Sequence, residues 1–197
     1  LELNSETDFV AKDTNFVSLA ESIGSDLLEK DIEDCKDSIN EKINGSISKL
    51  GENIKLRRFF KLDKTNYTFG YSHNNKIASV VELRNSDESL AKDICMQSVA
   101  SNPIAIDESS IALDILKSEK DIYKKELDKI DKKEDIKRNI LEGKMKKFIN
   151  DNTLLNQAFV KDPSTSLSKI IKDNQVISFH RYEVCLLYTS PSPRDGW

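Results

Sequence analysis

The sequence has little of the material that builds disulfide networks, metal centres or membrane spans. Its 197 residues include 3 cysteines, 2 histidines, 6 glycines and 4 prolines. Cys35, Cys95 and Cys185 are too few for a disulfide framework and lack zinc-ligand spacing, which favours a reducing compartment. The longest apolar stretches, such as residues 77–81, fall far short of the ~20 residues that a bilayer-spanning helix needs. We therefore expect a cytoplasmic protein without a membrane span or a structural metal.

Motifs for nucleotide binding and for hydrolysis are also missing. The chain contains neither GxxxxGK[ST] nor GxGxxG, the loops that hold phosphate groups in common nucleotide sites. His73 and His180 have no histidine or cysteine partner at ligand spacing, which disfavours zinc chemistry and histidine-assisted nucleophiles. Glu6 and Asp8 could serve acid–base chemistry, but capping or solvated roles explain them more simply. We expect a protein that is not an enzyme, uses no cofactor and takes no small-molecule substrate.

The charge balance points toward a protein partner. Thirty Lys and Arg residues face 34 Asp and Glu residues, giving a formal net charge of −4. Lysine and arginine do not gather on any predicted face, and nucleic-acid affinity depends mainly on neutralising phosphates. We therefore expect no direct contact with nucleic acid and no contact with membranes.

Hydrophobic periodicity over residues 1–86 predicts a first α+β lobe. Residues 1–4 read as an edge strand, and a second helix runs over residues 32–50 until Gly51 ends it. Period-two alternation over 54–62, 67–73 and 77–83 predicts three strands, which short turns would join into an antiparallel meander. The first helix is predicted to begin near residue 9. One apolar stripe of this helix would contain Phe9, Phe16, Ala20, Ile23 and Leu27.

Residues 87–184 predict a second lobe with a protruding helical hairpin. A helix over 87–101 stops before Pro103, and a long, charged, coiled-coil-like helix covers residues 108–133. An amphipathic helix from Ile136 and a shorter one after Pro163 could pair as a hairpin over about 133–174, with 154–161 as its tip. A strand over 176–184 completes the lobe. The predicted fold class is α+β, with two lobes of helices packed on small antiparallel sheets.

The last residues, 185–197, break every earlier pattern. Their sequence CLLYTSPSPRDGW looks like the translation of a sequencing-library adapter, so we expect an artefactual, disordered tail. The alternative is a genuine Ser/Pro-rich terminus.

One segment carries a recognisable signature. Periodicity alone makes Phe9 more often a core residue than a binding residue, but its context LNSETDFVAK resembles the signature segment of bacterial translation elongation factor Ts. The resemblance covers residues 1–184 and continues in family order through GENIKLRRF, YSHNNKIASVVEL, DICMQSVASNP, ILEGKMKKF, LLNQAFVKD and RYEV. Compared with the family, we expect this chain to be a core fragment that lacks the N-terminal ubiquitin-associated-like domain and the end of the second lobe.

The resemblance implies a guanine-nucleotide exchange factor that promotes GDP release from translation elongation factor Tu. Its implied partner is elongation factor Tu in the GDP-bound and nucleotide-free states. The TDFV segment implies a wedge near the partner's Mg²⁺ site, in which Phe9 inserts, Asp8 disturbs the metal site, and Thr7 and Val10 shape the helix start. It also nominates secondary contacts at Ile77, Met96 and Gln97, where Gln97 stands in place of a histidine that many members carry.

Two other functions stay open from the sequence. A non-catalytic helical-hairpin interaction or scaffold module fits the composition equally well, and the TDFV context alone separates it from an exchange factor. A small hydrolase using Glu6 and Asp8 would show turnover without any GTPase present.

Overall fold

The computed structural model describes residues 1–74 and 76–183 and confirms an α+β fold with small antiparallel sheets. Two compact units divide the described chain, one formed by residues 1–63 with the described residues from Tyr182 onward, the other by residues 64–181. The expected tail at 185–197 lies outside the described residues. No helix in the described ranges is long and apolar enough to cross a membrane.

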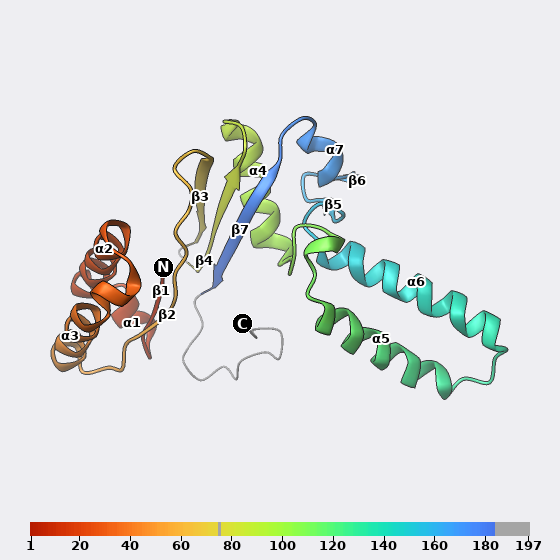
Figure 1. Ribbon diagram of the computed structural model, residues 1–197, viewed down its shortest axis with the longest axis horizontal. Coiled ribbons are helices and arrows are strands. Elements are labelled where there is room, and N and C mark those ends of the chain that lie inside the picture. The colour runs from red at the N-terminus through yellow and green to blue at the C-terminus, as the bar shows by residue number, and fades with distance from the viewer. Residues whose placement is uncertain (75, 184–197) are drawn as a thin grey trace. The chain divides into compact units, whose positions relative to one another are not determined.

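The first unit packs two long helices beside a two-stranded ribbon (Figure 1). Its elements are β1 (Glu2–Asn4), α1 (Asp8–Ala11), α2 (Thr14–Glu29), α3 (Ile32–Leu50) and β2 (Lys55–Arg58). The apolar stripes of α2 and α3 recur every three or four residues and face each other, because burial stabilises each helix more than its own propensity does. The buried core consists of Phe16, Leu19, Ile23, Leu27, Cys35, Ile39, Ile43 and Ile54.

The predicted single helix from residue 9 is in fact two helices. The first, α1, has four residues. Asp13 then starts α2 as its N-cap, since its carboxylate accepts a hydrogen bond from the Asn15 backbone N–H at 2.7 Å. This second start satisfies N–H groups that a continuous helix would have bonded internally. Phe9 therefore does not share the core stripe of Phe16 and Ile23.

The predicted three-stranded meander is wrong, because β2 pairs with β1 instead of with the next strand. Glu2 is buried between the guanidinium groups of Arg57, at 3.0 Å, and Arg58, at 2.6 Å. A buried carboxylate needs such partners, so these ion pairs fix β2 against β1. The first unit consequently ends at Asp63, earlier than the expected boundary at residue 86.

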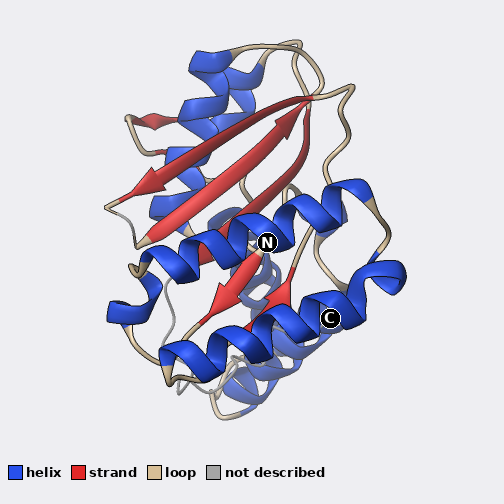
Figure 2. Ribbon diagram, turned by 90° about the vertical axis from the view of Figure 1, so that its left-hand side faces the viewer, coloured by secondary structure: helices blue, strands red, loops and turns tan. Residues whose placement is uncertain are grey.

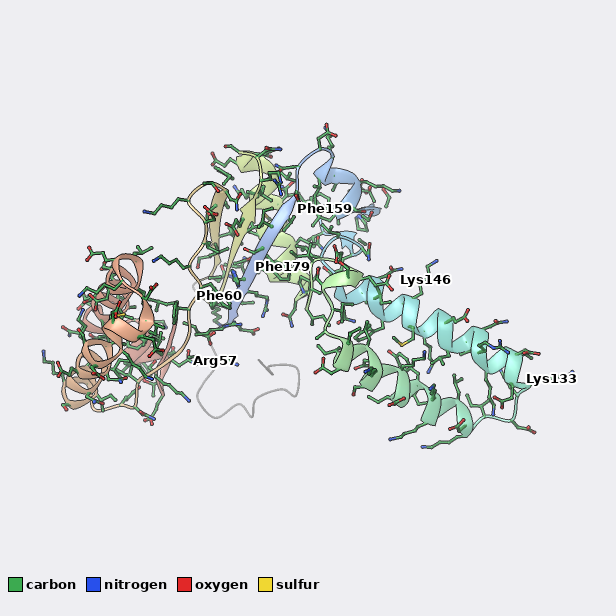
Figure 3. All side chains as sticks on the ribbon, in the orientation of Figure 1. Arg57, Phe60, Lys133, Lys146, Phe159 and Phe179 are labelled. Atoms are coloured by element: carbon green, nitrogen blue, oxygen red, sulfur yellow. The ribbon has the colours of Figure 1, made fainter. Side chains whose placement is uncertain are left out.

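In the second unit, β3 (Tyr67–His73) and β4 (Ile77–Leu83) form an antiparallel pair, and β7 (Val176–Glu183) lies on the other side of β4. Figure 2 shows the three strands side by side. Helix α4 (Glu88–Ser101) packs against β3 and β4. Phe159 is buried and Phe179 half-buried in the resulting core, and both are labelled in Figure 3.

A helical hairpin is present, but not where the sequence predicted it. After the short 3-10 turn Glu108–Ser110, α5 (Leu113–Asp128) and α6 (Glu134–Asn152) pack side by side (Figure 1). Lys144 of α6 reaches α5, with its ammonium 2.5 Å from the Glu126 carboxylate and 5.0 Å from the centre of the Tyr123 ring. The charged helix thus ends at Asp128 and pairs with its neighbour across a short loop, as short connections favour.

The residues expected to form the second hairpin arm have another structure. Here β5 (Ala158–Phe159) pairs with β6 (Asp162–Ser166), and α7 spans only Leu167–Ile171. The Asp162 carboxylate accepts from the Ser164 backbone N–H at 3.1 Å and from the Ser164 hydroxyl at 2.6 Å. These bonds close a local turn that competes with helix formation. The predicted hairpin range of about 133–174 is therefore wrong, and 113–152 replaces it.

Candidate partner-binding site

The predicted wedge lies on α1, which presents an aromatic ring to solvent. Phe9 is 82% exposed. The next residues, Val10 and Ala11, pack instead against the core of the first unit. One face of this single turn is therefore anchored. The opposite face holds an exposed ring, and covering its apolar surface with another protein would be energetically favourable.

Thr7 begins α1 and makes hydrogen bonds with its backbone and its side chain. Its hydroxyl accepts from the Val10 backbone N–H at 3.4 Å, the usual N-cap interaction. Both Thr7 donors go to Glu52: the hydroxyl donates to one carboxylate oxygen at 2.5 Å and the backbone N–H to the other at 3.0 Å. The Thr7 carbonyl accepts from the Ser5 hydroxyl at 3.0 Å.

Glu52 reaches Thr7 because of the turn before it. Gly51 ends α3 in the left-handed region, with φ of 73°, and its N–H donates to the Ile47 carbonyl at 2.9 Å. Glycine adopts this conformation without the steric penalty that a Cβ brings. The chain therefore turns sharply after α3, and the residue that follows meets the start of α1.

Asp8 is exposed beside Phe9 and forms a surface ion pair. Its carboxylate lies 3.0 Å from the Lys12 ammonium, one turn along the chain, and both side chains are more than half exposed. Such pairs contribute little stability, about 0–1 kcal/mol. Asp8 also occupies the first turn of α1, where a negative charge complements the helix dipole. Its carboxylate can exchange this lysine for another cationic group at small cost.

The three secondary residues lie in the second unit. Ile77 begins β4 opposite His73 and is half-buried, as is Met96 on α4. Gln97 is fully buried, with 0% exposure. Its amide oxygen accepts from the Val160 backbone N–H at 2.8 Å, and its amide nitrogen lies 3.1 Å from the Ala158 carbonyl oxygen. The structure thus gives Gln97 an internal bracing role and leaves no face of its side chain at the surface.

Sequence reasoning did not identify Glu52. The sequence did predict that Gly51 ends α3, which is where the chain turns. However, Glu52 is 45 positions from Thr7, so their contact follows from the packing of α2 on α3 and has no local sequence signal. Within the described ranges, no three His, Cys, Asp or Glu side chains are grouped to hold a metal ion.

Fold and site together define a two-unit α+β protein that displays an exposed aromatic residue on an anchored helix. A family model described as elongation factor TS matches residues 6–185. Elongation factor Ts of Ruthia magnifica subsp. Calyptogena magnifica is 40% identical, over 93% of this chain and 67% of the relative. The proteins of that name from Alkalilimnicola ehrlichii and Halothermothrix orenii are each 36% identical, over 93% of this chain and 67% and 68% of their own lengths. This chain belongs to the elongation factor Ts family.

Proposed function

We propose that this chain is a guanine-nucleotide exchange factor that accelerates GDP release from elongation factor Tu in the cytoplasm. In this proposal Phe9 enters the partner near its Mg²⁺ site and Asp8 accompanies it. The observation that supports the proposal most directly is the 82% exposure of Phe9 on a helix whose other face is anchored. Family membership supports the identity of the partner.

The mechanism requires no covalent chemistry on this chain. A GTPase holds its nucleotide through backbone N–H groups, a lysine and a Mg²⁺ ion that bridges phosphate oxygens. A protein that binds the nucleotide-free state more tightly than the GDP-bound state must weaken GDP binding by the same factor. The proposed factor is therefore not an enzyme that changes a substrate, and it needs no cofactor of its own.

The size of the Phe9 contribution can be bounded. Full burial of a phenylalanine side chain stabilises by roughly 1.5–3 kcal/mol. Because each ~1.4 kcal/mol changes an equilibrium constant tenfold, this ring accounts for about one to two decades of coupling. Any larger coupling needs additional contacts. We propose Ile77 and Met96 for these, with Gln97 acting through the segment that it braces.

The proposal is tested by Phe9→Ala, measured as release of fluorescent GDP from elongation factor Tu. We expect release to slow by about 10- to 100-fold, while the urea midpoint stays unchanged because the ring has almost no intramolecular contacts to lose. The matched control is Leu28→Ala, which removes another exposed apolar side chain, 66% exposed, from the same unit. Wild-type release with Phe9→Ala would refute the proposal. If the unmodified chain binds elongation factor Tu tightly without accelerating GDP release, the result would support the passive interaction module instead.

A further inference from the structure

We infer that Glu52 is the positioning residue of the exchange site: its carboxylate orients α1 and, through α1, the Phe9 ring. This inference rests on the proposed function. It concerns a residue outside the TDFV segment, which lies between α3 and β2 and has no predicted contact with the partner.

The inference begins with the capping chemistry of α1. In a capping box, the residue at the third helical position is Glu or Gln, and its side chain accepts from the backbone N–H of the N-cap residue. In α1 that third position is Val10, which packs against the core and whose side chain has no acceptor to offer. Glu52 supplies the missing acceptor from 45 positions away, at 3.0 Å from the Thr7 nitrogen. The box is thus completed by a tertiary contact, and Val10 remains available as an anchor.

The second Glu52 contact determines the orientation of Thr7. One carboxylate oxygen receives the Thr7 hydroxyl at 2.5 Å while the other receives the Thr7 N–H. Two hydrogen bonds to a planar carboxylate resist rotation of Thr7 and therefore fix the direction of α1. The apolar contacts of Val10 and Ala11 hold α1 against the core but are not directional. The hydroxyl hydrogen is committed to Glu52, so the oxygen lone pairs face the Val10 N–H.

A helix as short as α1 depends on these external bonds. Its four residues are far below the ~12–15 residues at which an isolated helix becomes even marginally stable. Loss of Glu52 would therefore free α1 to fray while the α2–α3 core remains folded. A frayed α1 still carries Phe9, but the ring no longer points in one direction, and small misplacements of a reacting or wedging group are costly.

The test compares Glu52→Gln and Glu52→Ala with the charge-matched control Glu41→Gln, an exposed residue of α3. We measure kcat and KM for fluorescent GDP release from elongation factor Tu, the urea midpoint, and hydrogen exchange of the Val10 and Ala11 amides in the free protein. The amide side chain of Gln keeps one acceptor, so kcat should fall about threefold, and about 10-fold in Glu52→Ala, which still carries the ring. KM and the urea midpoint should stay near wild type, because other docking contacts and the core persist.

Two further results sharpen the test. Thr7→Ser keeps the hydroxyl and should retain kcat within about twofold, whereas Thr7→Val should lower it. In Glu52→Ala, exchange protection should be lost at Ala11 and kept at Ile23 in the core of α2. Glu41→Gln should match wild type in every measurement.

The inference is overturned if Glu52→Ala keeps wild-type kcat and amide protection, or if kcat falls only in proportion to a lowered urea midpoint. Failure of the proposed function looks different. In that case elongation factor Tu releases GDP at the same rate with Phe9→Ala as with the wild type. Glu52→Ala then loses amide protection at Ala11 but leaves the rate of GDP release unchanged.

Discussion

Replacement of Gln97 by leucine should destabilise the second unit strongly, although the two side chains are both uncharged and similar in volume. Gln97 lies on α4 with no exposed surface. Its amide nitrogen lies 3.0 Å from the Ser101 hydroxyl, 3.2 Å from the Gln157 amide oxygen and 3.1 Å from the Ala158 carbonyl oxygen, and its oxygen accepts from the Val160 N–H at 2.8 Å. These bonds tie the segment that contains β5 to α4.

The expected loss follows from the groups that would remain. Leucine fills the space, but the Val160 N–H and the Gln157 amide oxygen lose the partners that Gln97 provides. A buried polar group without a hydrogen bond costs about 1–3 kcal/mol. The Gln157 amide oxygen is such a group, whereas the Val160 N–H belongs to a residue that is 47% exposed and adds less. A domain is stable by about 5–15 kcal/mol in total. The variant should therefore fold, with much of its stability gone and the β5 segment prone to local opening.

Urea unfolding measures this directly, with hydrogen exchange at Val160 as a local probe. The matched control is Gln175→Leu, since Gln175 is exposed and its amide oxygen accepts a single hydrogen bond from Arg84 at 2.9 Å. The control should lose no more than about 1 kcal/mol. A Gln97→Leu loss as small as that of the control would refute the bracing role. If GDP release fell while stability did not, Gln97 would act on the partner through the local conformation of the β5 segment and not through global stability.

Two further predictions concern the αL turn and the buried thiol. Gly51→Ala should cost about 1–2 kcal/mol, because the added Cβ meets no atom within 4 Å but φ is 73°; urea unfolding measures it, and a loss in Gly51→Asn as large as in Gly51→Ala would contradict the conformational reason. Burial raises the pKa of Cys95 from 9.0 to about 11, so folded protein at pH 8 should resist alkylation at Cys95, as followed by peptide mass spectrometry. Since the folded pKa lies above the unfolded one, this group's stability contribution is complete below about pH 9 and is lost as pH rises toward 11; rapid labelling of native Cys95, or a Tm that rises over this range, would contradict it.

Local sequence patterns predicted the elements well where the pattern was long. The helix expected over residues 32–50 is α3, and the strands expected over 67–73 and 77–83 are β3 and β4. In each case period and end signals agree: Gly51 stops α3, and the turn after His73 separates the strands. Such agreement between propensity, periodicity and turn chemistry is what lets a local reading succeed.

Pairing between elements was harder to predict, because nothing local specifies it. The strand β2 could have continued into a meander, but the buried Glu2 selects β1 as its partner through Arg57 and Arg58. Likewise β4 pairs with β7, nearly a hundred residues further along. The predicted hairpin failed for a similar reason, since α6 pairs with α5 across a short loop. The helical pattern near Ile170 forms only the short helix α7, because β6 and the Asp162 turn occupy the residues before it.

The candidate site shows the same division. Periodicity placed Phe9 on a core stripe, whereas the family resemblance implied an outward ring, and the structure exposes it because Asp13 restarts the helix. The signature segment was therefore readable from the sequence. Its support was not, since Glu52 reaches Thr7 only after α2 and α3 have packed.

In the proposed exchange mechanism, the rigidity of α1 determines how much of the Phe9 burial energy remains for nucleotide release. A loop that orders on docking spends about 1–2 kcal/mol per residue on lost backbone freedom. For four residues this would exceed the roughly 1.5–3 kcal/mol gained from one phenylalanine. Here the ordering is already complete in the free protein, through the packing of Val10 against the core and the two Glu52 hydrogen bonds. Under the proposal, the exposed ring transfers most of its burial energy to the partner, and Glu52, which lies outside the signature segment, controls the effectiveness of the wedge.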